Sequence, residues 1–176
     1  MNLAESPRRL RNYRNQPYNI RLEGGKEFEV FAQEICREWG WNIGVYMDKE
    51  DQWEKGESES HTEIKLDTQW PDTGNLFIEI KERRAADGTS QWRAAGIYDA
   101  SNPWLYLIGN YYRFWLFRCE DLRRLHRTGV YERKPRIQSP KDTSIGFVVP
   151  LADCERYCKR RWPECNYRIF YDPDPE

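Results

Sequence analysis

The chain lacks the long apolar runs that membrane proteins need. No stretch approaches the roughly 20 apolar residues of a transmembrane helix. Residues 1–21 also lack the apolar region of a secretory signal. We therefore expect a protein that makes no membrane contact and works in the cytoplasm.

Several sequence signatures of common enzyme classes are missing as well. There is no internal repeat, no low-complexity segment and no glycine-rich phosphate loop. His61 and His126 are the only histidines, and no Cys-His-Asp spacing suggests a nucleophilic triad. These absences argue against repeat proteins, P-loop enzymes and triad hydrolases.

The cysteines do not suggest a disulfide framework. Their number, five, is odd, and a cytoplasmic chain would keep them reduced. Cys154 and Cys158 are four residues apart in an amphipathic segment, a spacing typical of small residues that face the core. We expect buried thiols, and whether Cys36, Cys154, Cys158 and Cys165 bind anything stays open.

The charges are balanced in number but uneven in position. Lysine and arginine total 28, aspartate and glutamate 29, and the formal net charge is −1. Basic residues gather in the arm at 1–22 and again at 123–136. Such clusters are usually solvated surface, but phosphates would dock there if the partner is DNA.

The order of the predicted elements indicates a mixed α/β fold. We expect an irregular basic arm at 1–22 and a single domain at 23–176. The predicted helices lie at 24–40, 91–101, 119–129 and 151–162. The predicted strands lie at 41–48, 61–70, 76–82, 103–110, 111–118 and 144–150, with a loop at 134–144.

The segment 63–81, EIKLDTQWPDTGNLFIEIK, carries the sharpest chemical signal. Side chains alternate along strands, so a hairpin that turns near Thr73 would set Asp67 opposite Glu79. Two carboxylates could then hold Mg²⁺ or Mn²⁺, which activates water and stabilises charge on a phosphate. Lys81, two residues after Glu79, would reach the same point and assist the water.

A plainer interpretation stays open beside this one. The tripeptide EIK occurs twice, at Glu63–Lys65 and at Glu79–Lys81, and Glu-x-Lys is common in a chain with 32% charged residues. Exposed ion pairs across a hairpin would explain the pattern without catalysis.

The motif resembles the PD-(D/E)xK nuclease superfamily, which includes restriction endonucleases, Holliday-junction resolvases and phage nucleases. The resemblance matches Asp67, Glu79 and Lys81 to the family's final motif and Glu29 to its first-helix acid, with Glu34 as the alternative. It implies a restriction-endonuclease-like core, which is an α/β fold with a mixed central β-sheet flanked by helices. It also implies a Mg²⁺-dependent deoxyribonuclease (endonuclease) that binds DNA. It also implies metal ligation by Glu29, Asp67 and Glu79, and location in the host cytoplasm for a phage-encoded chain.

The resemblance spans about residues 25–125 and includes AAGIYDASNPWLYLIGN, which is similar to phage and bacterial nuclease-like proteins. Leu66 stands where the family has proline, and Ala95 where the phage-like group has serine. Gln91, Trp92 and Arg93 are the predicted DNA contacts. Some related nucleases hold an iron–sulfur cluster on one upstream and three C-terminal cysteines.

Three functional hypotheses follow. The first is the nuclease, with a homodimer as one means of cutting two strands. The second is a catalytically inactive DNA-binding module of the same fold, and the third an unrelated α/β interaction protein. The sequence leaves open endo- or exonucleolytic cleavage, the form of DNA, sequence preference and pathway.

Overall fold

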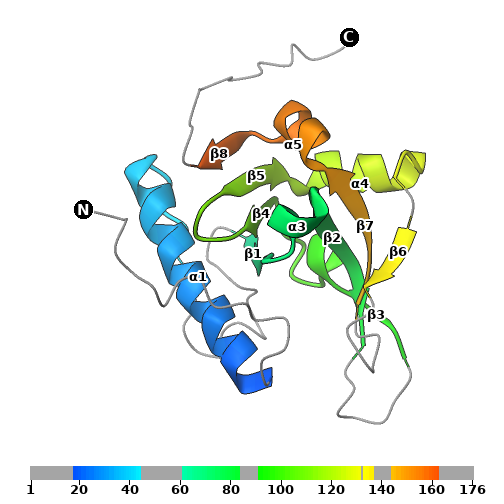
Figure 1. Ribbon diagram of the computed structural model, residues 1–176, viewed down its shortest axis with the longest axis horizontal. Helices are drawn as coiled ribbons and strands as arrows, with labels where there is room; N and C mark the ends of the chain where they lie inside the picture. Colours follow the sequence, from blue (N-terminus) through cyan, green and yellow to red (C-terminus); the bar gives the residue numbers. More distant parts are fainter. Residues whose placement is uncertain (1–17, 45–60, 84–90, 132, 137–143, 163–176) are drawn as a thin grey trace.

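Two four-stranded sheets and a long helix make up most of the fold (Figure 1). The computed structural model describes residues 18–44, 61–83, 91–131, 133–136 and 144–162. The first sheet contains β1 (Thr62–Leu66), β4 (Leu105–Gly109), β5 (Phe114–Arg118) and β8 (Arg160–Trp162). The second contains β3 (Arg93–Ala94), β2 (Asn75–Glu82), β7 (Ser144–Pro150) and β6 (Arg133–Arg136).

The helices are α1 (Tyr18–Glu38), α3 (Trp70–Thr73), α4 (Cys119–Thr128) and α5 (Leu151–Tyr157), with a 3₁₀ turn η3 (Gly96–Tyr98). In the first sheet, in the order β1-β4-β5-β8, β1 runs parallel to β4 and the other pairs are antiparallel. In the second, in the order β3-β2-β7-β6, all pairs are antiparallel. The predicted mixed α/β class, with a mixed sheet flanked by helices, is therefore confirmed.

The two faces of the first sheet belong to two separate cores. Along β4 and β5 the side chains alternate, as strand geometry requires. Leu107 and Phe114 face α1, where they meet Phe28 and Phe31. On the other face, the core contains Tyr106, Ile108, Trp115 and Phe117 of the first sheet, Ile78 and Phe147 of the second, and Leu122 of α4.

Several predicted elements are confirmed at their expected places. The segments 103–110 and 111–118 form the β4–β5 hairpin, and 119–129 forms α4, which Gly129 ends in a left-handed conformation. Residues 144–150 form β7. Cys36, Cys119 and Cys154 are buried, as expected, whereas Cys158 is only half-buried and Cys165 lies outside the described residues.

Other predictions were wrong. The first helix begins at Tyr18, so the arm predicted at 1–22 is helical from residue 18, and residues 1–17 lie outside the described ranges. Gly24 lies inside α1, where its carbonyl accepts a hydrogen bond from Tyr111 Oη at 3.4 Å. This tertiary contact helps offset the roughly 1 kcal/mol that a glycine costs a helix.

Short strands replace two further predictions. The segment predicted as a helix at 91–101 forms β3 and η3, and the loop predicted at 134–144 begins with β6. The last predicted helix ends at Tyr157, and residues 160–162 form β8 beside β5. Residues 41–44 are not a strand, and 45–48 are outside the described part. Among the described residues, no helix is both long and apolar enough to cross a membrane.

Candidate active site

Three charged side chains from β1 and β2 meet in one cluster. Lys65 Nζ is 2.6 Å from Glu63 Oε1 and 3.7 Å from Glu79 Oε2. The exposed side-chain fractions are 6% for Glu63, 15% for Glu79 and 32% for Lys65. Two carboxylates from strands of different sheets thus share one ammonium group. Of the three side chains, that of Lys65 is the most exposed to solvent.

The strand ladder explains why these side chains meet. Glu63 pairs with Tyr106 and Ile64 with Leu107 in the parallel β1–β4 ladder, and paired residues point to the same face. Ile64 and Leu107 both pack toward α1. Glu63 and Lys65 therefore lie on the opposite face, toward the second sheet that carries Glu79.

Tyr106 lies beneath this cluster and is fully buried. Its hydroxyl accepts a hydrogen bond from the backbone N–H of Glu79 at 3.5 Å. Burial raises the pKa of Tyr106 well above its usual value. The Glu79 and Glu63 carboxylates raise it further, against the lowering effect of the Lys65 charge. Tyr106 is thus a neutral phenol that links β4 to the backbone of β2.

Gly96 allows η3 to pack directly against Glu79. It has a φ of +55°, and a Cβ at this position would overlap the carbonyl oxygen of Glu79. The close approach requires glycine. The segment AAGIY thus holds the backbone of the residue that contributes one of the two carboxylates.

Asp67 is buried, with 2% of its surface exposed, and it ties two backbone segments together. Oδ1 accepts a hydrogen bond from Gln69 N at 2.9 Å, and Oδ2 accepts one from Phe77 N at 3.2 Å. The Asp67 N–H donates to the carbonyl of Gly109 at 2.7 Å. Its carboxylate is thus held by backbone donors at the connection between β1 and β2.

The predicted hairpin of residues 61–82 was wrong. β1 pairs with β4 and β2 pairs with β7, so Glu79 lies opposite Gly146 instead of Asp67. The PDTG turn forms one helical turn, α3, with proline in its first turn and left-handed Gly74 at its end. A helical turn redirects the chain and prevents the tight antiparallel return.

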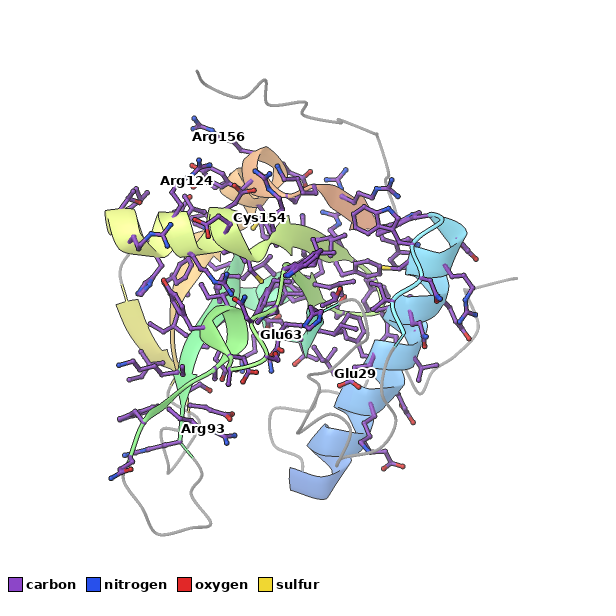
Figure 2. The ribbon with its side chains drawn as sticks, turned by 180° about the vertical axis from the view of Figure 1, so that it is seen from behind. Glu29, Glu63, Arg93, Arg124, Cys154 and Arg156 are labelled. Atoms are coloured by element: carbon purple, nitrogen blue, oxygen red, sulfur yellow. The ribbon has the colours of Figure 1, made fainter. Side chains whose placement is uncertain are left out.

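The predicted metal ligands do not form a group. Among the described residues, no three His, Cys, Asp or Glu side chains are close enough together to hold a metal ion. Glu29 lies on α1, which covers the sheet face opposite to Glu63 and Lys65 (Figure 2). The trio of Glu29, Asp67 and Glu79 is therefore not assembled, and Glu34 is on the exposed side of α1.

Lys81 and the predicted DNA contacts lie elsewhere. A β-bulge falls between Glu79 and Lys81, and Lys81 is exposed beside Ala94 of β3. Arg93 is ion-paired with Glu82 and lies apart from Glu63 (Figure 2). The Trp92 ring is covered by the Arg83 guanidinium, 4.9 Å from the ring centroid, and Gln91 is exposed.

Sequence reasoning missed Glu63, Lys65 and Tyr106 as site residues. The signal was present, because EIK occurs twice and the first copy lies on an alternating strand. The buried Cys119 is not a candidate nucleophile beside these residues. Burial raises the pKa of the nearby Cys119 thiol to about 12, so this thiol stays protonated at neutral pH.

Comparisons with known proteins assign no family to this chain. No family model, no curated protein and no solved structure matches this chain.

Proposed function

We propose that this chain hydrolyses phosphodiester bonds of DNA in a reaction that depends on Mg²⁺ or Mn²⁺, on a restriction-endonuclease-like core. The observation that carries the proposal is the convergence of Glu63 and Glu79 on Lys65 Nζ, at 2.6 and 3.7 Å. Two carboxylates and a lysine are the groups that the PD-(D/E)xK resemblance implies. The proposal assigns the lysine to the first EIK copy instead of the second.

The donor set suits a hard divalent cation. Glu63 and Glu79 offer carboxylate oxygens, and Mg²⁺ is commonly held by one or two carboxylates, with waters and substrate phosphate as the other ligands. Such an ion lowers the pKa of a bound water and neutralises charge that develops on the phosphate. The proposed ligands are therefore Glu63 and Glu79, with no third carboxylate required.

The chain's own residues have distinct roles in this proposal. Lys65 supplies a positive charge beside the carboxylates, where it can orient water or stabilise the phosphate in the transition state. Tyr106 is a positioning residue, because its hydroxyl holds the backbone N–H of Glu79. Asp67 keeps the connection between β1 and β2 in place through its two backbone hydrogen bonds.

The catalytically inactive DNA-binding module of the same fold remains the second candidate. The observation that favours it is the salt bridge itself, because Lys65 already neutralises part of the charge on Glu63 and Glu79. A largely desolvated ion-pair network can serve structure alone. Metal-dependent turnover separates the two candidates.

The deciding experiment compares Lys65→Met with Lys81→Met, which remove the lysines of the two EIK copies. Cleavage of linear duplex, single-stranded and four-way-junction DNA is measured with Mg²⁺ and with Mn²⁺. We expect the loss of Lys65 to reduce the rate by about 10²-fold or more. Lys81→Met should stay close to wild type, because Lys81 is exposed and lies beyond the bulge.

Each other outcome has a clear meaning. Loss of cleavage only in Lys81→Met would return the lysine role to the second copy. A wild type that binds DNA without metal-dependent cleavage would favour the inactive module. As a check on ligation, Mn²⁺ should raise the melting temperature of the wild type and have less effect on Glu79→Gln.

A further inference from the structure

Trp104 presents an exposed aromatic ring immediately before β4. Its exposed fraction is 70%, the highest among the large hydrophobic side chains of the described part. The ring stacks with His61, with 6.1 Å between ring centroids and 18° between planes. Single exposed aromatic residues are common on protein surfaces. The backbone conformation and the hydrogen bonds around this pair, however, are unusual for a surface residue.

The backbone on both sides of the pair is strained. Within the described ranges, His61 and Asn102 are the two non-glycine residues with positive φ, at 50° and 51°. Histidine and asparagine adopt this conformation more readily than most residues, yet it is still less favourable than the usual backbone conformations. Such strain persists only where surrounding contacts hold it in place, and it gathers at functional sites.

Hydrogen bonds fix the segment that carries Trp104. Its N–H donates to the His61 carbonyl at 2.8 Å, and its own carbonyl accepts from Cys119 N at 2.7 Å. Arg123 donates to the Asn102 side chain at 3.1 Å and to the Pro103 carbonyl at 3.2 Å. The exposed ring is therefore pre-positioned, which reduces the entropy lost when it binds a flat partner.

The stacked pair is adjacent to the proposed site. His61 is two residues before Glu63, and Trp104 is two residues before Tyr106, the residue paired with Glu63. Two residues of strand span about 6.6 Å. An aromatic surface beside the proposed phosphodiester site matches the chemistry of a nucleotide.

We propose that Trp104 and His61 form a stacking platform for an unpaired base of the DNA strand that enters the Glu63–Glu79 site. The inference rests on the proposed function and names its substrate class as DNA with a single-stranded segment. In an intact duplex, neighbouring base pairs cover the faces of each base, so a splayed or single-stranded base is the form that offers a face. Aromatic stacking of this kind contributes about 1–3 kcal/mol per base.

The test measures DNA affinity without divalent metal, so that binding is separated from cleavage. Trp104→Ala, Trp104→Phe and the control Tyr112→Ala are titrated against a fluorescent single-stranded oligonucleotide and its duplex. Tyr112 is a matched control because it is 55% exposed and lies in the turn at the other end of the β4–β5 hairpin. We expect Trp104→Ala to weaken single-strand binding by about 5- to 140-fold. Duplex affinity should change less than twofold, and Trp104→Phe should retain most of the single-strand affinity.

The other outcomes overturn the proposal in distinguishable ways. Unchanged single-strand affinity in Trp104→Ala, or an equal loss in Tyr112→Ala, would refute the platform. If metal-dependent cleavage by the wild type persisted beside that result, the proposed function would stand. Trp104-dependent binding by a wild type that does not cleave would support the platform and refute the nuclease. A change in oligomeric state in Trp104→Ala, with DNA affinity unaltered, would assign the surface to self-association.

Discussion

Asp67 illustrates how one buried carboxylate can hold two backbone segments together. Its two oxygens accept hydrogen bonds from the N–H groups of Gln69 and Phe77, which begin the turn and the next strand. Each donor would otherwise lose its partner in a partly buried region. The burial of Asp67 is therefore explained by the hydrogen bonds that its carboxylate accepts from backbone N–H groups.

Replacing Asp67 with asparagine therefore tests the structural role. The asparagine side chain retains one acceptor oxygen, so one of the two backbone N–H groups is left without its partner. We expect Asp67→Asn to lower the free energy of unfolding by about 1–3 kcal/mol in the absence of metal. Urea denaturation measures the change, and Asp72→Asn on exposed α3 is the control, with an expected effect within about 0.5 kcal/mol. An unchanged stability with abolished cleavage would instead make Asp67 a catalytic group.

Asp121 is the second carboxylate whose surroundings predict a measurable effect. Arg118 Nε and Nη2 donate to it at 2.9 and 3.1 Å, and Lys159 Nζ is 3.4 Å away. Burial by itself would raise the pKa of Asp121. The Arg118 hydrogen bonds and the charges of Lys159 and Arg118 outweigh burial, so the pKa is below its usual value.

The direction of this pKa shift sets the pH dependence of stability. A carboxylate with a lowered pKa in the folded state stabilises the fold above its unfolded pKa of about 3.9. That contribution disappears as the pH falls through the folded pKa. We expect Asp121→Asn to be less stable than wild type by about 1–3 kcal/mol at pH 7, with the difference shrinking below about pH 4. Urea titrations across pH 2.5–7 would contradict this if the difference stayed constant.

Among the elements, η3 depends on one glycine. Gly96 brings the turn against the backbone of β2, where a Cβ would overlap the Glu79 carbonyl. Gly129 shares the left-handed conformation, with φ of +67° against +55° for Gly96, but has nothing within 4 Å of its own Cβ position. The pair therefore separates backbone strain from steric overlap.

We expect Gly129→Ala to cost about 1 kcal/mol, the penalty of a left-handed alanine. Gly96→Ala should cost a further 1–3 kcal/mol or so because β2 must shift to make room. Chemical denaturation of both variants measures the difference. Equal losses in the two variants would show that η3 can move away from Glu79 without penalty.

The elements also show the limit of local pattern. Alternation identified β1 and β2, because apolar residues on one face record which side is buried. Two apolar runs around a Gly-Asn turn identified the β4–β5 hairpin. It did not reveal that β1 pairs with β4 and β2 with β7. Pairing depends on contacts between residues distant in sequence. The turn sequence PDTG fits either a hairpin turn or a helical turn, so it decided neither.

In the molecule as a whole, the first sheet separates two hydrophobic cores and contributes side chains to both. β4 and β5 contribute side chains to the α1 core on one face and to the second-sheet core on the other. We expect their amide hydrogens to exchange most slowly in hydrogen–deuterium exchange. β3, with both residues exposed, should exchange early. Equal protection of β3 and β4 would contradict this arrangement of the cores.

The sequence by itself determined the class of the fold, most strand and helix positions, the burial of Cys36, Cys119 and Cys154, and the presence of two Glu-x-Lys tripeptides. These are local properties, recorded in periodicity and residue type. Only the tertiary structure decided that the lysine of the first tripeptide, Lys65, lies near the Glu79 carboxylate of the second strand. Parallel pairing of β1 with β4 turns Glu63 and Lys65 toward Glu79 of β2, while Lys81 is exposed near the end of β2, beside β3. That choice depends on packing between distant segments, which no single stretch of sequence contains.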